Sequence, residues 1–255
     1  MTGESSEVLT AHIGPALVIT LNRPAVLNAV TRSMCETIAD ALDTAESNPE
    51  VRAAILTGTG ARSFSSGADL RDVTGEPIDA TSARGRYGFG GIVRHPFTKP
   101  LIAAVNGLAY GGGCETLLRC DVVLAAGHAT FALPEVTRGV VAGGGGAVRL
   151  ARAVGPRLAA EMLLTGHPID ARRALASGLI TGIHEDPLTA ALELCQTIAD
   201  NAPLAIAATL RLLRADEDAA WEANAAEITA LLTAEDVQEG AAAFLEKRRP
   251  QWRGR

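Results

Sequence analysis

Short β-forming runs alternate with helical periodicity along the first half of this 255-residue chain. The run Ala16–Leu21 is rich in aliphatic residues and is followed by Pro24, which disfavours continued strand pairing. Apolar residues then recur at steps of three and four from Met34 to Ala45, and Thr31 precedes them as a candidate N-cap. This pattern predicts an amphipathic helix. Strands and helices at this spacing favour right-handed crossovers and a largely parallel sheet, so the predicted fold class is α/β. Further strands are predicted at residues 53–57, 101–105, 122–126 and 129–132.

The pattern becomes helical after Gly143. Proline at the first helical position, Asp or Thr caps, and glycine after the last turn mark the helix ends. Only residues 180–183 look extended in this half. We therefore expect an α/β core at residues 1–195 and a C-terminal helical section at residues 196–255, packed against the core or a neighbouring subunit. The predicted helices are 156–164, 170–177, 187–199, 203–213, 217–232 and 236–247.

Composition excludes several classes of protein. Charged residues make up 20% of the chain and the mean hydropathy is +0.17, which excludes an intrinsically disordered protein. The net charge of −6 argues against a protein that coats nucleic acid or an anionic membrane. Without an apolar run of about 18 residues or a signal-peptide pattern, we expect a cytoplasmic protein with no nucleic-acid and no membrane partner. The four cysteines form no CxxC pair and, with five histidines, indicate neither a metal site nor a disulfide framework.

Two glycine-rich loops each follow a predicted strand, at residues 65–70 (SSGADL) and 106–115 (NGLAYGGGCE). Glycine lets the backbone approach a ligand closely, and a strand-to-helix turn aims free N–H groups outward. Two such loops side by side would supply two N–H donors to one carbonyl oxygen, the geometry of an oxyanion hole. A single loop of this kind is more often a tight turn without a ligand. Neither loop has the spacing of a nucleotide-phosphate cradle.

Two glutamates near these loops are candidate acid/base groups. Glu115 is expected in the first turn of the helix after Gly113, where a lone carboxylate ordinarily interacts with the helix dipole. Glu135 follows twenty residues later in an apolar stretch, where an ionised carboxylate needs a partner or a shifted pKa. If both lie beside the oxyanion hole, they form a pair able to move a proton and a water. Their spacing in the sequence alone does not establish that they meet.

Six segments, taken in order, carry a family resemblance. Each is weak alone, but their order and spacing are specific. They are Arg23-Pro24 with LNA at 27–29, FSSGADL at 64–70, residues 99–107 beginning Lys99-Pro100, GGGCE at 111–115, Pro134-Glu135, and residues 241–248. On these segments the sequence resembles the crotonase (enoyl-CoA hydratase/isomerase) family over nearly the whole chain.

The resemblance implies a crotonase-like ββα superhelix with twisted, largely parallel sheets and a C-terminal helical trimerisation section. It implies a homotrimer or a dimer of trimers, an acyl-CoA substrate, and no separate cofactor, because CoA is part of the thioester substrate. By the same resemblance the backbone N–H groups of Ala68 and Gly112 hold the thioester oxygen, and Glu115 and Glu135 are the catalytic carboxylates. Members that hydrate enoyl-CoA carry both glutamates.

The resemblance also points to residues that contact CoA. Asp69 is equally suited to capping the helix that follows it. Phe244 and Lys247 match the family's Phe-x-x-Lys, which reaches the adenine and phosphate end from an adjacent subunit. Taken alone, residues 247–249 are a solvated charge run at a helix end. The implied CoA-binding residues are Val26, Leu27, Ser66, Ala68, Asp69, Leu70, Phe244 and Lys247.

Some positions depart from or blur the family pattern. Tyr110 and Thr116 replace the small or apolar residues that are more usual there, which affects the acyl pocket and the packing behind Glu115. The glycine run 143–146 resembles the family's loop beside the acyl tail. Residues 71–94 are the least family-like, and their glycines predict a mobile segment that lines the substrate entrance.

The function predicted from these features is that of an enoyl-CoA hydratase, which reversibly adds water syn to trans-2-enoyl-CoA and gives 3-hydroxyacyl-CoA. A Δ3-Δ2-enoyl-CoA isomerase is an alternative that needs one base and would leave Glu115 dispensable. A carnitinyl-CoA-type dehydratase is another, because residues 131–135 also resemble that group. A non-catalytic CoA-binding or RNA-binding relative is less favoured, because both glutamates are present and the net charge is −6.

Overall fold

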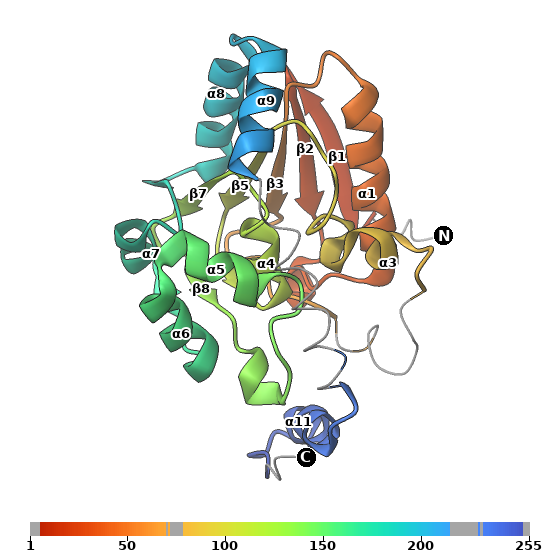
Figure 1. Cartoon of the computed structure of the whole chain (residues 1–255), viewed down its shortest axis with the longest axis vertical. Helices are drawn as coiled ribbons and strands as arrows, with labels where there is room; N and C mark the ends of the chain where they lie inside the picture. Colours follow the sequence, from red (N-terminus) through yellow and green to blue (C-terminus); the bar gives the residue numbers. More distant parts are fainter. Residues whose placement is uncertain (1–5, 70, 72–78, 215–228, 230–231, 252–255) are drawn as a thin grey trace.

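A computed structural model describes residues 6–69, 71, 79–214, 229 and 232–251 (Figure 1). The strands are β1 (Val8–Ile13), β2 (Ala16–Leu21), β3 (Ala53–Gly58), β4 (Ser63–Ser65), β5 (Leu101–Val105), β6 (Leu108–Tyr110), β7 (Val122–Ala126), β8 (Thr130–Ala132), β9 (Ile169–Asp170) and β10 (Gly182–His184). The helices are α1 (Arg32–Ser47), α3 (Ala83–Tyr87), α4 (Gly112–Leu117), α5 (Gly146–Val154), α6 (Pro156–Thr165), α7 (Ala171–Ser177), α8 (Pro187–Ala199), α9 (Pro203–Leu213) and α11 (Glu235–Leu245). Short 3-10 turns are η1 (Pro24–Val26), η2 (Phe89–Gly91) and η3 (Glu135–Arg138).

Two sheets organise the chain. The larger has the strand order β1-β2-β3-β5-β7-β10 and the smaller β4-β6-β8-β9. Every neighbouring pair is parallel except β1 with β2 and β8 with β9. This confirms the predicted α/β fold with largely parallel sheets. The sequence analysis missed β1, because five of its six residues are exposed and it lacks the apolar run of an inner strand.

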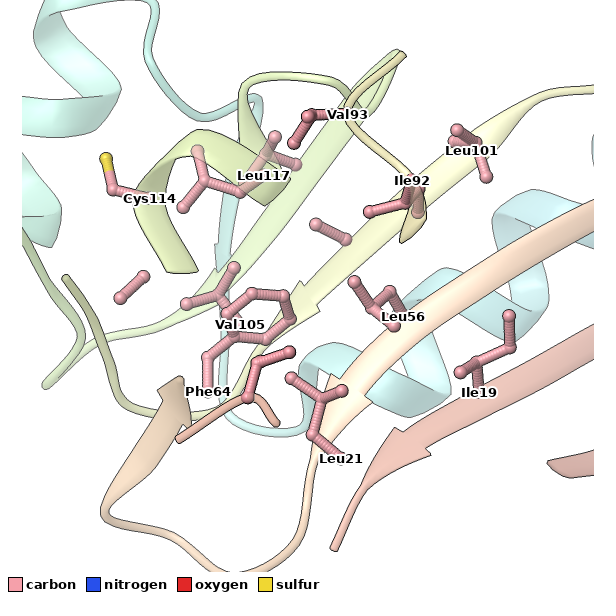
Figure 2. Close-up of a cluster of buried hydrophobic side chains, with 14 of the residues drawn as sticks. Ile19, Leu21, Leu56, Phe64, Ile92, Val93, Leu101, Val105, Cys114 and Leu117 are labelled. Carbon is pink, nitrogen blue, oxygen red and sulfur yellow. The ribbon is translucent and has the colours of Figure 1, made fainter. Parts of the chain in front are cut away.

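Side chains of the larger sheet alternate between two apolar layers, as the period of a strand requires. Leu17, Ile19 and Leu21 of β2 join the layer that contains α1, and Figure 2 shows Ile19 and Leu21 in that layer with Leu56 and Phe64. The neighbouring Ala16 and Val18 face the other layer, which α8 covers. Both faces are therefore buried, which is typical of parallel sheets and explains the continuous apolar runs.

The predicted helix ends are confirmed where a cap was recognised. Thr31 precedes α1, and its Oγ1 accepts a hydrogen bond from the Met34 N–H at 3.2 Å. Asp170 caps α7, which ends at Gly178 in the left-handed region. Helices α8 and α9 begin at the predicted prolines. The predicted helix 217–232 lies mostly outside the described residues.

Several elements differ from the prediction. The helix predicted at 236–247 runs from Glu235 to Leu245. The extended segment predicted at 180–183 is wrong by two residues: Leu179 and Ile180 are buried where they close α7, and the strand β10 begins at Gly182. The strand predicted at 129–132 begins one residue later, at Thr130. Helix α5 was not predicted, because it starts directly after a glycine run that resembles a loop.

The predicted domain boundary at residue 195 falls within α8, which runs unbroken from Pro187 to Ala199. Cys195 and the partly buried Ile198 lie on the same apolar layer against the larger sheet. The division of the chain into core and helical section stays a prediction. Among the residues that the structure describes, no helix has both the length and the apolar character needed to span a bilayer.

Candidate active site

The two glycine-rich loops meet, as the sequence analysis expected. The predicted loop 106–115 was wrong in part, because it contains the strand β6 and the start of α4. Its glycine run follows β6 as the first loop follows β4, and these parallel neighbours end at the same edge of the smaller sheet. Gly67 adopts a left-handed φ of 98°. A β-carbon at Gly67 would lie 3.1 Å from the backbone nitrogen of Gly112, so only glycine allows this approach without strain.

Two backbone N–H groups are available where the loops meet. The Val30 N–H donates to the Gly67 carbonyl at 2.8 Å and the Asp69 N–H to the Val30 carbonyl at 3.0 Å, so the N–H of Ala68 between them faces away from Val30. Gly112 is the first residue of α4, and its N–H therefore has no acceptor within the helix. This geometry is compatible with the oxyanion-hole roles predicted for Ala68 and Gly112.

Glu115 lies in α4 with only 4% of its surface exposed. Its Oε1 accepts a hydrogen bond of 2.9 Å from the N–H of Gly146, the first residue of α5. A β-carbon at Gly144 would lie 2.5 Å from Oε2. The glycine run predicted to lie beside the acyl tail therefore packs around this carboxylate, a role that the sequence analysis missed.

Glu135 begins η3 and faces the other glycine run. A β-carbon at Gly111 would lie 3.3 Å from Oε1 of Glu135. Its Oε2 is buried and has no hydrogen-bond partner among the described residues. One catalytic candidate, Glu115, therefore lies in the helix that begins at Gly112. The other, Glu135, packs against Gly111, the residue that precedes that helix.

Both carboxyl groups hold protons more tightly than an exposed glutamate. Burial raises the pKa of Glu115, and the negative charge of Glu135 raises it further, against the opposing effect of the Gly144 and Gly146 N–H groups and of Arg149. Burial also raises the pKa of Glu135. Because the two groups repel each other when both are ionised, the pair retains a proton above the ordinary carboxyl range. The two carboxyl groups therefore interact through their charges, so one can hold a proton while the other is ionised.

This raised pKa predicts how stability depends on pH. Above the ordinary value of 4.5, folded Glu115 binds more protons than unfolded Glu115, so its contribution to the free energy of unfolding falls as pH rises through the raised pKa. We expect Glu115→Gln to be more stable than the wild type at alkaline pH and the difference to shrink toward acid pH. Urea unfolding across the pH range measures this. A difference that is constant or largest in acid contradicts the assigned burial of the charge.

Three predicted CoA-binding residues lie in one cluster of loops. Val26 is exposed at the end of η1, and Leu27 follows it with a left-handed φ of 55°. The Ser66 N–H donates to the Leu27 carbonyl at 3.0 Å, which fixes this segment against the first glycine loop and so beside Ala68. Leu70 lies outside the described residues.

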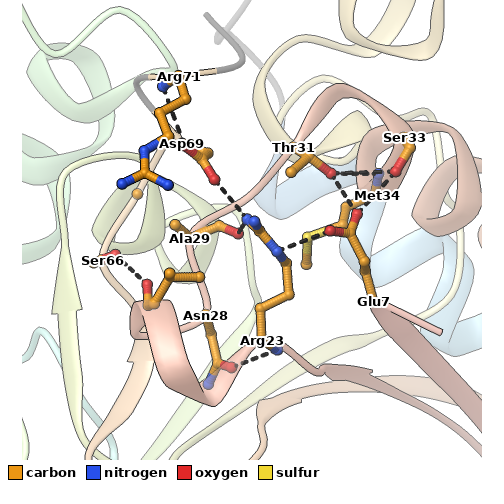
Figure 3. Close-up of polar contacts among 12 residues, drawn as sticks. Glu7, Arg23, Asn28, Ala29, Thr31, Ser33, Met34, Ser66, Asp69 and Arg71 are labelled. Atoms are coloured by element: carbon orange, nitrogen blue, oxygen red, sulfur yellow. Dashed lines mark hydrogen bonds and ion pairs between the residues drawn. The ribbon is translucent and has the colours of Figure 1, made fainter. Parts of the chain in front are cut away.

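Asp69 has protein partners for both carboxylate oxygens (Figure 3). Oδ2 is 2.8 Å from an Arg23 guanidinium nitrogen, and Oδ1 accepts the Arg71 N–H at 3.1 Å. The hydrogen bond from Arg23 lowers the pKa of Asp69 and keeps it ionised. These contacts favour the capping alternative for Asp69 over a contact with the anionic groups of CoA.

Arg23 itself was missed as a functional residue. Its Nε lies 2.8 Å from Glu7, and it also donates to the Ala29 carbonyl at 2.8 Å (Figure 3). Buried Asn28 accepts the Arg23 N–H and donates to the Ser63 carbonyl at 2.8 Å. The Arg-Pro and Leu-Asn-Ala segments of the resemblance therefore fasten the loops that carry Val26 and Ala68, which is a signal the sequence did contain.

Phe244 and Lys247 lie at the end of α11, beside η3. The Arg138 guanidinium stands 4.8 Å above the Phe244 ring. Lys247 has a left-handed φ of 54°, in the position after a helix where glycine is usual. Within the described part of the chain, no hydrogen bond, ion pair or ring contact joins either residue to the loops of Val26 and Ser66.

The remaining departures from the family pattern have local contacts. The Thr116 hydroxyl donates to the Gly112 carbonyl at 2.8 Å, within the helix that carries Glu115. Thr130 donates to the Tyr110 hydroxyl at 3.2 Å. Phe89 in η2 packs over the oxyanion loop, since a β-carbon at Gly112 would overlap its ring. Part of the predicted mobile entrance, residues 72–78, lies outside the described residues.

Comparison with known proteins agrees with this geometry. The family model described as enoyl-CoA hydratase/isomerase matches residues 14–255. The 2,3-dehydroadipyl-CoA hydratase of Escherichia coli strain K12 is 39% identical over 98% of this chain and 100% of its own. The carnitinyl-CoA dehydratase of Citrobacter koseri is 39% identical over 96% of this chain and 97% of its own. The crystal structure of a carnitinyl-CoA hydratase from Mycobacterium avium superposes with a TM-score of 0.93 at 40% identity, covering 99% of this chain and 100% of that one. The chain therefore belongs to the enoyl-CoA hydratase/isomerase family, within the crotonase superfamily.

Proposed function

We propose that this protein is an enoyl-CoA hydratase, a hydro-lyase that adds water across the double bond of a trans-2-enoyl-CoA. The observation that carries the proposal is a pair of buried carboxyl groups on either side of the start of α4: Glu115 within that helix and Glu135 packed against Gly111. The hydratase and dehydratase names of its relatives support the same reaction class.

The first task of the site is to make C3 of the substrate electrophilic. In the proposed mechanism the thioester oxygen accepts hydrogen bonds from the N–H groups of Ala68 and Gly112. Negative charge grows on that oxygen as water adds, so donors fixed at this position stabilise the transition state more than the ground state. The dipole of α4, which starts at Gly112, acts in the same direction.

The second task is to add the hydroxyl group of water to C3 and a proton to C2. Glu115 and Glu135 hold the water between them; its oxygen bonds to C3 as Glu115 takes one of its protons. Glu135 delivers its proton to C2 on the same face, so the product gains one water in total. The proton that Glu115 took then returns to Glu135, which restores the pair for the next cycle. The fixed hydrogen bond from Gly146 suits Glu115 to the ionised role, and the unpartnered buried Oε2 suits Glu135 to the protonated role.

When the reaction runs in reverse, the same groups perform a dehydration. A carnitinyl-CoA-type dehydratase is therefore the second candidate. The relatives named carnitinyl-CoA dehydratase favour it over the isomerase. A Δ3-Δ2-enoyl-CoA isomerase needs one base, and the burial of a second ionisable carboxyl beside the first would then cost stability without serving the reaction.

We propose that CoA enters only as part of the thioester and that no separate cofactor is needed. Water and two carboxyl groups balance the reaction without a redox step. Val26, Leu27 and Ser66 form the near part of the CoA site, and Phe244 with Lys247 the far part. Holding Lys247 in a left-handed backbone conformation costs about 1 kcal/mol, and such strain is typical of residues kept for function.

We also propose that the protein is a homotrimer or a dimer of trimers. Leu212 and Leu213 of α9 and Leu245 of α11 are largely exposed in the single chain, although large apolar side chains favour burial. Light scattering should give a mass of three or six chains of 26.4 kDa, and Leu212→Gln with Leu213→Gln should weaken assembly. A wild-type monomer at micromolar concentration contradicts this.

The proposed activity is tested by following the absorbance of the conjugated enoyl thioester across short, medium and branched acyl chains. We expect the absorbance to fall with at least one member of the panel and the 3-hydroxyacyl-CoA to accumulate. If the protein is folded and binds CoA but changes the absorbance of no enoyl thioester in the panel, it is a non-catalytic CoA-binding protein and not a hydratase.

A further inference from the structure

A cavity of about 350 Å³ lies outside the candidate active site. Its walls come from residues 94–98, from Arg119 after α4, from α5 and from α9. None of the residues lining it is a predicted catalytic or CoA-binding residue. Five arginines line it: Arg94, Arg119, Arg149, Arg211 and Arg214.

Two of these arginines are buried and held by backbone carbonyls. Arg119 is 9% exposed and donates to the His95 carbonyl at 3.0 Å. Arg149 is 8% exposed and donates to the Val93 carbonyl at 2.7 Å. These hydrogen bonds to neutral carbonyl groups fix the two guanidinium groups in the wall.

The carboxylates that interact with the wall lie outside the cavity lining, and one of them is Glu115, whose pKa the charge of Arg149 lowers. Asp121 pairs with Arg214 at 2.7 Å. Asp43 faces His95 at 3.1 Å, and Glu46 accepts from Thr98 at the rim. Among the described residues, no carboxylate lines the cavity itself.

The arginines of the wall also repel one another. Burial lowers the pKa of Arg119 to about 10; the charges of Arg214 and Arg149 lower it as well, and Asp121 opposes them. Like charges held around one cavity destabilise the empty site and are stabilised by an anion inside it. The arrangement therefore has the electrostatics of an anion-binding site.

We infer that this cavity binds a small anion that carries a diphosphate group. Planar guanidinium groups donate pairs of parallel hydrogen bonds to phosphate oxygens. Several such groups around a cavity of small-molecule size suit two linked phosphates better than a single monovalent ion. Arg94 and Arg211 are exposed, whereas Arg119 and Arg149 are buried, so we place the first two at the entrance and the other two in the interior.

Calorimetric titration with inorganic pyrophosphate tests the inference without requiring any catalytic activity. The discriminating variant is Arg94→Gln with Arg211→Gln, because both residues are exposed and their replacement leaves buried Arg119 and Arg149 in place. The matched control is Arg157→Gln with Arg172→Gln, which changes the net charge equally at exposed positions outside the cavity. We expect saturable binding in the wild type and the control, and a Kd for pyrophosphate that is higher by about tenfold or more in the cavity variant than in the wild type.

Three further measurements distinguish binding in this cavity from binding at the CoA site and identify the group that is bound. Lys247→Gln should keep pyrophosphate binding, because that lysine belongs to the proposed CoA site. Rising KCl should weaken binding, since the entrance charges are screened. Titration with ADP shows whether the cavity recognises a nucleoside diphosphate or only the diphosphate group. If ADP binds more tightly than pyrophosphate and the cavity variant loses that binding, the ligand is a nucleoside diphosphate. If the two bind equally, the cavity recognises the diphosphate group alone.

The inference is overturned if the wild type binds no pyrophosphate, including the case in which a second copy of the chain covers the cavity. It is equally overturned if the cavity variant and the control bind alike. Neither result bears on hydratase activity, which the absorbance panel measures separately.

Discussion

Glu135→Gln is expected to lower kcat by about 10²–10⁴-fold, the range typical of a lost acid/base group. Glutamine keeps the size of the side chain but cannot deliver a proton to C2, and burial has already raised the pKa of Glu135 so that it can serve as an acid. The loss should fall on kcat, because the thioester still reaches the N–H groups of Ala68 and Gly112. Steady-state hydration of an accepted enoyl-CoA measures it, with CoA affinity measured in parallel.

The matched control is Glu193→Gln, which removes an equal charge from an exposed position on α8. It should leave kcat and CoA affinity unchanged. An active Glu135→Gln variant would show that the proton at C2 comes from another group. Glu115→Gln should lose hydration activity on the same scale. If it still hydrates at the wild-type rate, Glu115 is not the base; if the wild type shifts a Δ3 double bond without adding water, the one-base isomerase replaces the hydratase.

Gly144→Ala is expected to lower kcat by about 10²-fold while the fold is kept, because small misplacement of a catalytic group has this effect. The added methyl group would lie 2.5 Å from Oε2 of Glu115 and must displace that carboxylate. The atom it meets is the end of a flexible side chain, so the strain is relieved by moving the carboxylate rather than the backbone. Kinetics and thermal unfolding of the same preparation measure the two effects.

Gly127→Ala provides the control for adding a methyl group to a glycine. Its nearest neighbour would be a methyl of Ile183 at 3.7 Å, an ordinary contact, and Gly127 is exposed in a turn. Activity and unfolding temperature should both match the wild type. If Gly144→Ala also retains full activity, the position of the Glu115 carboxylate does not control the reaction.

Local signals in the sequence predicted most of the sheet and helix framework. Ala16–Leu21 was recognisable because both faces of β2 are buried, and α1 because Thr31 caps an apolar stripe. Asp170 and Gly178 marked the ends of α7 in the same way. By contrast, β1 exposes most of its residues and pairs through the backbone, which leaves no apolar pattern to find.

The candidate site was predicted in its residue types but not in its contacts. The order of the glycine loops and the two glutamates indicated an oxyanion hole with an acid/base pair, yet twenty residues separate Glu115 from Glu135. Only the parallel arrangement of β4, β6 and β8 brings their loops together. That the 143–146 glycines hold Glu115 depends on where α5 begins, and no local pattern sets that position relative to α4.

Charge was the least predictable feature. The sequence analysis interpreted the basic run at residues 247–249, taken alone, as solvated charge at a helix end, but Arg248 pairs with Glu239 and Glu246. The five arginines of the cavity come from four separate segments, so the sequence gives no sign of their cluster. Long-range pairing decides which charges can meet a ligand, and it follows from the fold rather than from neighbours in the chain.

The central claim, that Glu115 and Glu135 add water to an enoyl thioester, is tested most directly by mass spectrometry of the product formed in ¹⁸O-labelled water. The account predicts that the wild type converts trans-2-enoyl-CoA into a 3-hydroxyacyl-CoA carrying one labelled oxygen on C3. The Glu115→Gln, Glu135→Gln double variant should bind CoA and form no labelled product. Labelled product from the double variant at the wild-type rate, or none from folded wild type across the acyl panel, would contradict the claim.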